Sequence, residues 1–355
     1  MKSYKKANII VDLQFGSCGK GLLAGYMAKR THPDTVVCAW GPNAGHTFID
    51  ADDNKMVVTM VPNGVVSPNL ERVMIGPGAV VNPELLQMEL ESLAPWIGDA
   101  KVMIHEHAAV VTESHRFAEA NYSFKIGSTM KGVGEAVISK IRRDPQRPTV
   151  ARDIFRSTPL EAYVVCVEEY NMEMDRAEIL QVEGSQGFSL GINNGYYPYV
   201  TSRECTVQQI MSDCAIPRNM FDLTVIGTAR TYPIRVANRY DKDGNMIGTS
   251  GPCYPDQMEI SWDVVGVPAE LTTVTKLPRR VFSFSKEQVH QAIRMNGVDE
   301  VFLNFANYIN NYYELEAIID AIEESGVPVT ALGWGPKETD IRDRDSRAML
   351  IERPI

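Results

Sequence analysis

A glycine-rich turn between an apolar run and a helix-forming stretch restricts the fold of this chain more than any other feature. Residues 7–15 (ANIIVDLQF) are predicted to form a buried strand, 16–21 (GSCGKG) a turn and 22–30 a helix. Residues 35–40 (TVVCAW) follow as a second strand. Parallel sheets are built from units of this order, so the chain is expected to begin with one.

The same alternation of strands and helices returns later in the chain. Asn82 and Pro83 supply an N-cap and a first-turn proline for a helix, and Ser285 with Gln288 forms a capping box for another that Gly297 ends. The other expected elements are strands at 72–76, 101–106, 301–305 and 327–332, and helices at 83–94 and 313–325. We therefore expect an α/β fold with a mostly parallel central sheet and helices on both faces.

Length alone leaves the number of domains open. A chain of 355 residues fits two or three domains or one large α/β domain. No low-complexity tract, linker-like stretch or repeat divides the sequence. Its middle, roughly 106–285, is rich in loops and predicts no strand, which suggests long insertions beyond the strand ends, where α/β proteins keep their sites.

Charge and cysteine content restrict the partners and the compartment. The net charge of −10 argues against binding to a nucleic acid polymer, which needs a dense basic surface, but permits small anionic ligands. The cysteines form no CxxC pair, which favours a reduced, cytoplasmic protein. Asp12 and Gln14 interrupt the only apolar run near the N-terminus, so that run suits a strand better than a signal peptide. No apolar stretch is long enough to span a membrane.

Two loops carry residues suited to chemistry. In the first, Gly16–Gly21, backbone N–H groups, a helix N-terminus and Lys20 suit an anion, although Gln14 and Gly21 break the Walker A pattern. The alternative is a tight turn with a solvated lysine. In the second loop, residues 41–47, His46 suits proton transfer near neutral pH, and the alternative is a histidine satisfied by a backbone carbonyl.

Together, DLQFGSCGKG and WGPNAGHT resemble the paired signature of the adenylosuccinate synthetase family. Further segments resemble that family's motifs: KIGSTMKGVGEA (125–136) with Arg142 and Arg143, VEGSQGFSLGINNGYYPYVTS (182–202), TTVTKLPRRV (272–281) and LGWGP (332–336). The resemblance spans about residues 7–336 and therefore implies a single domain over 1–355. It implies a fold related to the phosphate-binding-loop proteins, and a ligase that uses a nucleoside triphosphate to join L-aspartate to C6 of a purine nucleotide.

The resemblance also implies roles for individual residues. The catalytic group is Ser17, Lys20 and His46, with His46 as general acid. The triphosphate site is Gly16, Ser17, Cys18, Gly19, Lys20, Gly21, Gly45, His46, Thr47, Asn304, Phe305, Asn307, Gly335 and Pro336. The purine monophosphate site is Ser17, Asn43, Ala44, Ser128, Thr129, Arg143, Gln186, Thr201 and Val236. The aspartate site is Thr275, Lys276, Arg279 and Arg280.

A metal ion and a second subunit are implied in the same way. The family uses Mg²⁺, for which Ser17 and the Gly45 carbonyl occupy the matching positions. The family is also a homodimer, and Arg143 matches an arginine that reaches the nucleotide phosphate of the neighbouring subunit.

Three departures from the family pattern bear on the substrates. Ser17 stands where the family has the Asp base, and its small neutral side chain leaves room for the 2-amino group of guanine. Asn307 stands where the family has the Asp that reads the guanine of GTP, and an amide that donates and accepts suits adenine. Leu277 replaces an arginine that grips a carboxylate, so the partners of aspartate differ.

These departures and the short length resemble the phage-encoded branch of the family, which converts dGMP to N6-succino-2-amino-2′-deoxyadenylate for 2-aminoadenine DNA. We expect dGMP, L-aspartate and ATP or dATP as substrates. The alternatives are an ordinary family member that uses IMP and GTP, and an inactive purine-nucleotide-binding protein. The sequence leaves open the choice of ATP or dATP, deoxyribose selectivity, and the group that takes the N1 proton.

Overall fold

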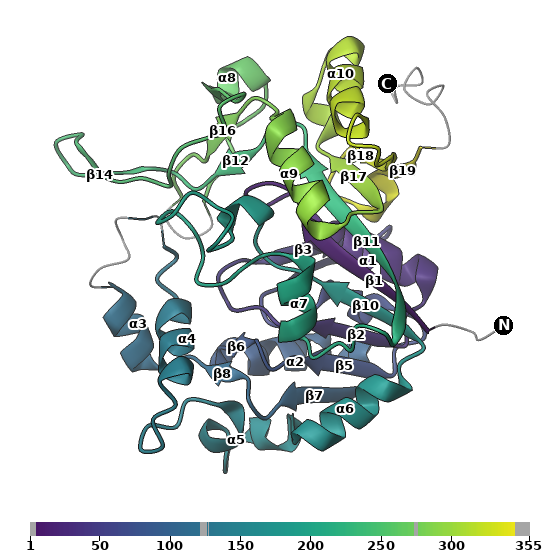
Figure 1. Ribbon diagram of the computed structural model, residues 1–355, viewed down its shortest axis with the longest axis vertical. Helices are drawn as coiled ribbons and strands as arrows, with labels where there is room; N and C mark the ends of the chain where they lie inside the picture. Colours follow the sequence, from purple (N-terminus) through teal and green to yellow (C-terminus); the bar gives the residue numbers. More distant parts are fainter. Residues whose placement is uncertain (1–4, 121–125, 127, 273–275, 345–355) are drawn as a thin grey trace.

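The computed structural model describes residues 5–120, 126, 128–272 and 276–344, and one large sheet organises them (Figure 1). In spatial order its strands are β19 (Ile341–Asp343), β18 (Val329–Gly333), β17 (Glu300–Asn304), β11 (Phe221–Arg230), β1 (Lys5–Asp12), β10 (Ile179–Glu183), β2 (Thr35–Cys38), β5 (Arg72–Ile75), β7 (Lys101–His105) and β9 (Val164–Val165). Only β19 pairs antiparallel with its neighbour in this sheet. The expected mostly parallel sheet is confirmed.

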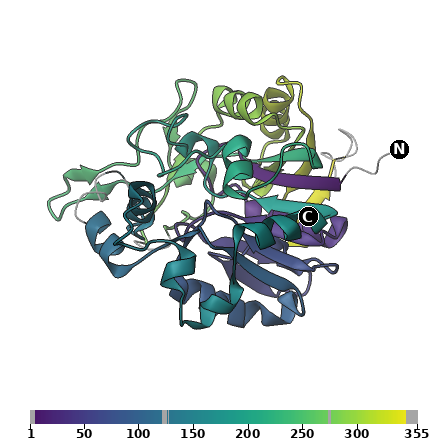
Figure 2. The ribbon, with the colours of Figure 1, turned by 60° about the horizontal axis from the view of Figure 1, so that its bottom comes forward.

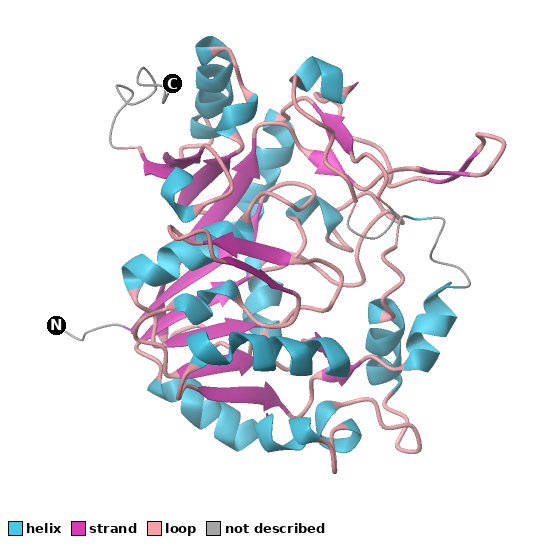
Figure 3. Ribbon diagram, turned by 180° about the vertical axis from the view of Figure 1, so that it is seen from behind, coloured by secondary structure: helices cyan, strands magenta, loops and turns pink. Residues whose placement is uncertain are grey.

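Both faces of the sheet are covered because successive side chains of a strand point to opposite sides. In β1, Ile9 and Val11 join one buried apolar cluster and Ile10 joins the other. The first cluster packs under α6 (Val167–Arg176), α7 (Val207–Asp213), α9 (Lys286–Asn296) and α10 (Tyr312–Glu323). The second packs under α1 (Lys20–Thr31) and α2 (Pro83–Ile97), which lie in front in the view from behind (Figure 3).

The ends of the helices follow the sequence signals closely. The Asn82 side chain accepts the N–H of Leu85 and caps α2. Ser285 accepts the N–H of Gln288 and caps α9, which Gly297 ends at a φ of 61°. The capping box is only half formed, because the Gln288 side chain donates to the hydroxyl of Ser189 at 2.8 Å. Gln288 thus ties α9 to the neighbouring loop.

Residues 106–285, for which no strand was predicted, contribute two central strands to the sheet. β10 and β11 both lie between 106 and 285, and they flank β1 on its two sides. Ile9 is paired with Val182 of β10 and with Val225 of β11. The sequence ILQVE of β10 is not the continuous apolar run expected of a strand buried on both faces, because Gln181 and Glu183 are buried polar residues. Short strands with buried polar groups lack the usual pattern.

The remaining elements lie outside the large sheet. They are the pairs β3 (His46–Ile49) with β4 (Lys55–Val58), β6 (Val80–Val81) with β8 (Ala109–Val110) and β13 (Arg239–Tyr240) with β14 (Met246–Gly248), the sheet of β12 (Ile234–Arg235), β16 (Arg280–Phe282) and β15 (Glu259–Ile260), and the helices α3 (Glu113–Ala120), α4 (Val133–Arg142), α5 (Ala151–Ile154) and α8 (Trp262–Val265). Short 3₁₀ turns are η1 (Asn63–Val66), η3 (Pro159–Tyr163), η4 (Phe188–Leu190), η5 (Ala306–Tyr308) and η6 (Glu338–Asp340). The β13–β14 hairpin projects from the body in two views (Figures 1 and 2).

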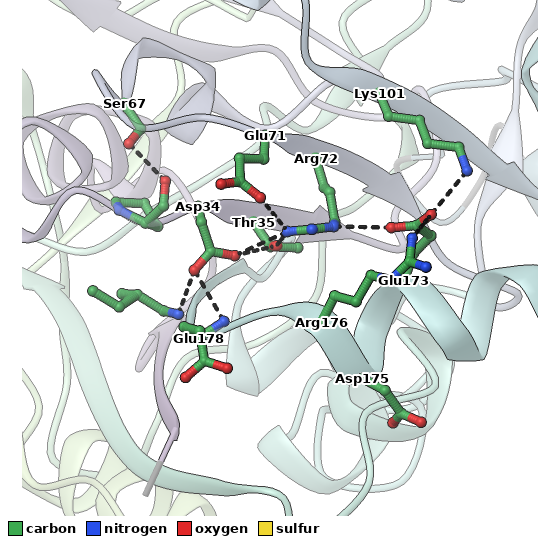
Figure 4. A network of polar contacts seen from close by, with 12 residues as sticks. Asp34, Thr35, Ser67, Glu71, Arg72, Lys101, Glu173, Asp175, Arg176 and Glu178 are labelled. Carbon is green, nitrogen blue, oxygen red and sulfur yellow. Dashed lines mark hydrogen bonds and ion pairs between the residues drawn. The ribbon is translucent and has the colours of Figure 1, made fainter. Parts of the chain in front are cut away.

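A network of charged side chains joins the opposite, amino ends of the strands (Figure 4). Arg72, at the start of β5, contacts Asp34 at 3.4 Å and Glu173 of α6 at 3.0 Å. Asp34 also accepts the backbone N–H groups of Glu178 and Ile179. The network therefore links β2, β5, α6 and β10 on the side away from the loops. In the described part of the chain, no helix is long and apolar enough to cross a membrane.

Candidate active site

The loops at the carboxyl edge of the sheet enclose a cleft of about 410 Å³. It brings together residues that are far apart in the sequence: Phe15, Gly16, Ser17, Gly19, Lys20, Gly21, Asn43, Ala44, Gly45, His46, Thr47, Ser128, Thr129, Met130, Gln186, Leu190, Val236, Ala237, Arg239, Thr272, Arg279 and Phe305. Most of the residues expected at the three substrate sites line this one cleft. Its size suits small-molecule ligands.

Asp12, at the end of β1, holds the glycine-rich turn in shape. One carboxylate oxygen accepts the N–H groups of Gln14 and Gly16 at 3.0 Å each. The other accepts the N–H of Cys18 and the ammonium group of Lys20, both at 3.1 Å. Because Asp12 is 3% exposed, these bonds satisfy a buried charge. Asp12, which interrupts the apolar run in the sequence, therefore holds the turn in place through its hydrogen bonds.

The turn leaves the N-terminus of α1 open toward the cleft. Gly19 is the N-cap at a φ of 90°, no side chain caps the helix, and its first turn has no acidic residue. A Cβ at Gly19 would lie 2.1 Å from the amide nitrogen of Asn304, so only glycine fits here. Free N–H groups and a helix N-terminus favour an anion at this point. Lys20 adds its charge and donates to the carbonyl of Gln186 at 2.6 Å.

Cys18 and Ser17 face in different directions. Cys18 is fully buried, its thiol contacts the side-chain oxygen of Gln14, and burial followed by the charge of Asp12 raises its pKa well above the ordinary value. Cys18, which the sequence placed at the triphosphate site, does not line the cleft, and its backbone N–H donates to Asp12. Ser17 is exposed, lines the cleft and has a φ of 60°.

His46 is positioned by residues that the sequence did not single out. Its Nδ1 lies 2.8 Å from a carboxylate oxygen of Glu183, and its ring stacks on Trp40 with centroids 4.2 Å apart at 17°. Glu183 is itself held by the backbone N–H of Asn63 at 2.8 Å and by its amide group at 3.1 Å. A carboxylate only accepts, so Nδ1 carries the shared proton and Nε2 is left for chemistry.

Several of the residues predicted to bind the purine monophosphate line the cleft and are joined by hydrogen bonds. Thr129 donates to the side chain of Asn43 at 2.7 Å, and Ser128 donates to Glu119 at 2.7 Å. Arg239, which sequence reasoning missed, lines the cleft beside them and donates to the Ser128 carbonyl at 2.9 Å. Ala44, Gln186 and Val236 also line the cleft, whereas Thr201 and Arg143 do not.

The segment after β17 places an aromatic ring at the cleft. Phe305 lines it, and the buried guanidinium of Arg230 lies 3.8 Å from the centre of its ring. Arg230 also donates to the Ser17 carbonyl at 3.2 Å and pairs with Glu270. Asn304 is buried and donates to the Cys18 carbonyl, and Asn307 is exposed. Neither Asn304 nor Asn307 lines the cleft; the same is true of Gly335 and Pro336 after β18.

The residues expected to bind the substrate aspartate do not lie together. Arg279 lines the cleft, and burial lowers its pKa below the ordinary arginine value. Arg280 instead pairs with Glu259 at 2.6 Å and donates to the hydroxyl of Ser250. Lys276 is exposed and is not part of the lining, and Thr275 lies outside the described residues. Arg279 is thus the aspartate candidate that the cleft includes.

The donors near the turn suit a cation held mainly by a bound phosphate chain. Within residues 5–120, 126, 128–272 and 276–344, no three His, Cys, Asp or Glu side chains gather as a metal site. Asp12 is taken up by its four hydrogen bonds, which leaves the hydroxyl of Ser17 and the carbonyl of Gly45 at the cleft. Mg²⁺ accepts such oxygen donors and commonly binds through substrate phosphates.

Comparisons with known proteins agree with this geometry. The family model for adenylosuccinate synthetase matches residues 9–177 and 153–320. The N6-succino-2-amino-2′-deoxyadenylate synthase of Acinetobacter phage SH-Ab 15497 is 47% identical over 95% of this chain and 93% of that protein. The adenylosuccinate synthetase of Pyrococcus horikoshii is 30% identical over 95% of this chain and 98% of that protein.

Two solved structures share the fold. The succinoaminodeoxyadenylate synthetase of cyanophage S-2L, bound to dGMP and to dATP as an energy donor, superposes with a TM-score of 0.91 at 44% identity, over 98% of this chain and 97% of that one. The fully ligated adenylosuccinate synthetase of Plasmodium falciparum gives 0.76 at 19% identity, over 95% of this chain and 99% of that one. The second likeness is one of fold alone.

Proposed function

The chain belongs to the adenylosuccinate synthetase family, and we propose that it joins L-aspartate to C6 of dGMP. The product is N6-succino-2-amino-2′-deoxyadenylate, the compound named for phage relatives that are 43–47% identical. The energy donor is ATP or dATP. The observation that carries the proposal is Ser17, a small neutral residue in the cleft wall at the position where the family has an aspartate.

The reaction has two steps. The γ-phosphoryl group moves from the triphosphate to O6 of the purine, the nucleoside diphosphate leaves and the N1 proton is lost. The amine of aspartate then attacks C6 and loses a proton, the C6–O6 bond breaks, and inorganic phosphate leaves with the oxygen. Phosphorylation is needed because a purine 6-oxygen is a poor leaving group, whereas phosphate is a good one.

The described residues support the first step by placing positive groups around the phosphate chain. The N–H groups of the turn, the N-terminus of α1 and Lys20 stabilise charge on the transferring group. His46, held by Glu183, donates from Nε2 to the developing charge near O6 as general acid. Mg²⁺ would be held by Ser17, Gly45 and the phosphates, and would supply further charge neutralisation there.

The purine and the aspartate occupy the remaining walls. Asn43 and Gln186 face the purine nucleotide, Ser128, Thr129 and Arg239 bind its 5′-phosphate, and Val236 packs near its sugar. Arg279 binds a carboxylate of aspartate. The adenine of the triphosphate lies against Phe305, whose far side is supported by Arg230.

Base choice follows from Ser17. A larger carboxylate side chain here would occupy the space that the 2-amino group of guanine needs, whereas serine leaves space beside N1 and C2. Serine is not a base at neutral pH, so a group other than Ser17 takes the N1 proton.

The decisive assay is release of inorganic phosphate that depends on aspartate. The mixture of dGMP, L-aspartate and ATP should be turned over faster than the mixture of IMP, L-aspartate and GTP. A clear preference for IMP and GTP would instead identify an ordinary adenylosuccinate synthetase, which the intact His46 and Lys20 would also serve. Tight dGMP binding with no release in either mixture would identify an inactive binding protein.

We propose further that the protein acts as a homodimer of single-domain subunits in the cytoplasm, which is the host's if a phage encodes it. Arg143 is the exposed C-cap of α4 and lies outside the cleft lining, which suits an arginine that reaches the neighbouring subunit's nucleotide phosphate. The six cysteines are all free thiols, which suits a reducing compartment. Sedimentation of the purified protein tests the dimer.

A further inference from the structure

The ring of His46 is held from two directions at right angles to each other. In the plane of the ring, Nδ1 meets the Glu183 carboxylate at 2.8 Å. Across its face, the indole of Trp40 lies nearly parallel, with 4.2 Å between ring centroids. His46 is 7% exposed, so little of the ring is left to solvent. The carboxylate fixes which nitrogen points into the cleft, and the indole restricts rotation and tilt.

Trp40 is well placed to act as a fixed wall. It lies two residues after the end of β2, is 2% exposed, and its backbone carbonyl accepts the N–H of Val80 at 3.0 Å. The next residue, Gly41, packs closely against Val80 and Val133. Trp40 is therefore anchored in the core on one side and presents its aromatic face to His46 on the other.

We propose that Trp40 is a positioning residue for His46, and that it sets the direction in which Nε2 donates its proton. The inference rests on the proposed function for the role of His46, but the stack itself does not. The indole lies nearly parallel to the imidazole, so it resists rotation and tilt of that ring and keeps Nε2 in one direction. A displacement of about 1 Å can cost on the order of 100-fold in rate, so ring tilt matters for catalysis.

The aromatic face, and not the indole N–H, makes the contact with His46. Nε1 of Trp40 makes no hydrogen bond with the described residues. Trp40 also lines a cavity of about 20 Å³ on the side of Arg203 and Asp213, which has room for one water molecule to serve that N–H. Phenylalanine keeps an aromatic face without an N–H, so it should preserve most of the function.

The kinetic test compares Trp40→Phe with Trp40→Leu and Trp40→Met, which fill similar space without an aromatic ring. The leucine and methionine variants should lower kcat about 10- to 100-fold and change KM for dGMP less than about 3-fold, because the nucleotide contacts remain. Trp40→Phe should keep at least about a third of kcat. Trp96, exposed on α2, gives the control: Trp96→Leu should retain wild-type values.

Proton NMR gives a readout that a merely structural role would not move. One histidine ring signal of the wild-type protein should be shifted upfield by the indole ring current, and it should disappear in His46→Gln. That shift should be reduced in Trp40→Phe and lost in Trp40→Leu. This measurement needs no turnover, so it stands even if the protein prefers IMP to dGMP, in which case the kinetics are repeated with IMP.

Three results would overturn the proposal. The first is a wild-type spectrum without an upfield histidine signal, which would mean that the stack is absent in solution. The second is unchanged kcat in both Trp40→Leu and Trp40→Met. The third is an equal loss of kcat in all three Trp40 variants together with loss of dGMP binding, which would show that Trp40 only supports the fold.

Discussion

Lys20 and Asp12 form an ion pair at 3.1 Å beneath the turn that would bind the triphosphate, with side chains 5% and 0% exposed. The pair is joined to three backbone N–H groups through the same carboxylate. Removing one partner of such a pair leaves a buried charge without compensation. Asp12→Asn should therefore reduce the free energy of unfolding by about 3–5 kcal/mol and lower kcat, as measured by urea unfolding and phosphate release.

Asp241→Asn is the matched control for Asp12→Asn. Asp241 also accepts several bonds, from Asn245 and Asp243, but it does so in the exposed turn of the β13–β14 hairpin. Asp241→Asn should leave the free energy of unfolding and kcat close to their wild-type values. Equal effects of the two variants would contradict a special role for Asp12.

Ser17→Asp should lower the use of dGMP relative to IMP. The larger charged side chain fills the space beside N1 and C2 and restores the base that suits hypoxanthine. The ratio of kcat/KM for dGMP and for IMP measures the effect, with Ser17→Ala as the control that keeps the space. If the ratio stays the same in Ser17→Asp, this residue does not set base choice.

Arg239→Gln should raise KM for dGMP by about 10- to 100-fold, because a charged hydrogen bond to phosphate contributes about 1.5–3 kcal/mol. Its kcat should change little, since the 5′-phosphate does not react. Arg147, whose side chain is 83% exposed, provides the control variant Arg147→Gln. Wild-type KM in Arg239→Gln would place the phosphate elsewhere.

Asn307→Asp should shift the energy donor from ATP toward GTP. The amide donates and accepts, as the edge of adenine requires, whereas a carboxylate only accepts and suits the N1–H and N2–H of guanine. Initial rates with ATP, dATP and GTP in the same mixture of dGMP and aspartate measure the shift. Asn310→Asp, a few residues along the same loop, is the control, and a donor preference that follows it equally would argue against base reading by Asn307.

Because His105 is buried, we expect the protein to lose stability in mild acid. Burial, then the charge of His107, lowers the pKa of His105 to about 4. Between that value and the ordinary 6.5 the unfolded chain binds the extra proton, so stability is full above pH 6.5 and falls as the pH drops toward 4. At pH 5 the loss should be about 2 kcal/mol.

His105→Asn should remove most of that acid sensitivity. Nδ1 of His105 accepts the backbone N–H of His107 at 3.0 Å, and an asparagine oxygen keeps an acceptor without titrating. Urea midpoints at pH 7.5 and pH 5 test this, with His32→Asn at the exposed end of α1 as the control. A pH-dependent loss in His105→Asn as large as in wild type would assign the effect to other groups.

Local sequence signals predicted much of the fold but few of the contacts within the site. Asn82, Ser285 and Gly297 end their helices as their chemistry requires, because capping depends on neighbours within a few residues. The strands β10 and β11 escaped prediction, since their polar side chains bond to distant segments: the Gln181 side chain, for example, donates to the carbonyl of Ala24.

In the site, too, the residues within local motifs were predicted and the residues that depend on distant contacts were not. The turn at Gly16–Gly21 and His46 were predicted from motifs, and the structure places them in one cleft. Glu183 was not predicted, because its contact with His46 joins residues 137 positions apart. Arg239 has no surrounding motif, and only the folding of β13 against the 128–130 loop brings it to the cleft.

The position of β1 in the sheet affects how the protein is made. β1 is synthesised before both of its neighbours in the sheet, β10 and β11, which begin at Ile179 and Phe221. At roughly 5–20 residues per second, the intervening 170 or so residues take about 8–34 s to synthesise. Throughout that interval Ile9, Ile10 and Val11 have no strand to pair with. Chaperone supply in the producing cell, more than the stability of the finished enzyme, should therefore limit its yield at high expression.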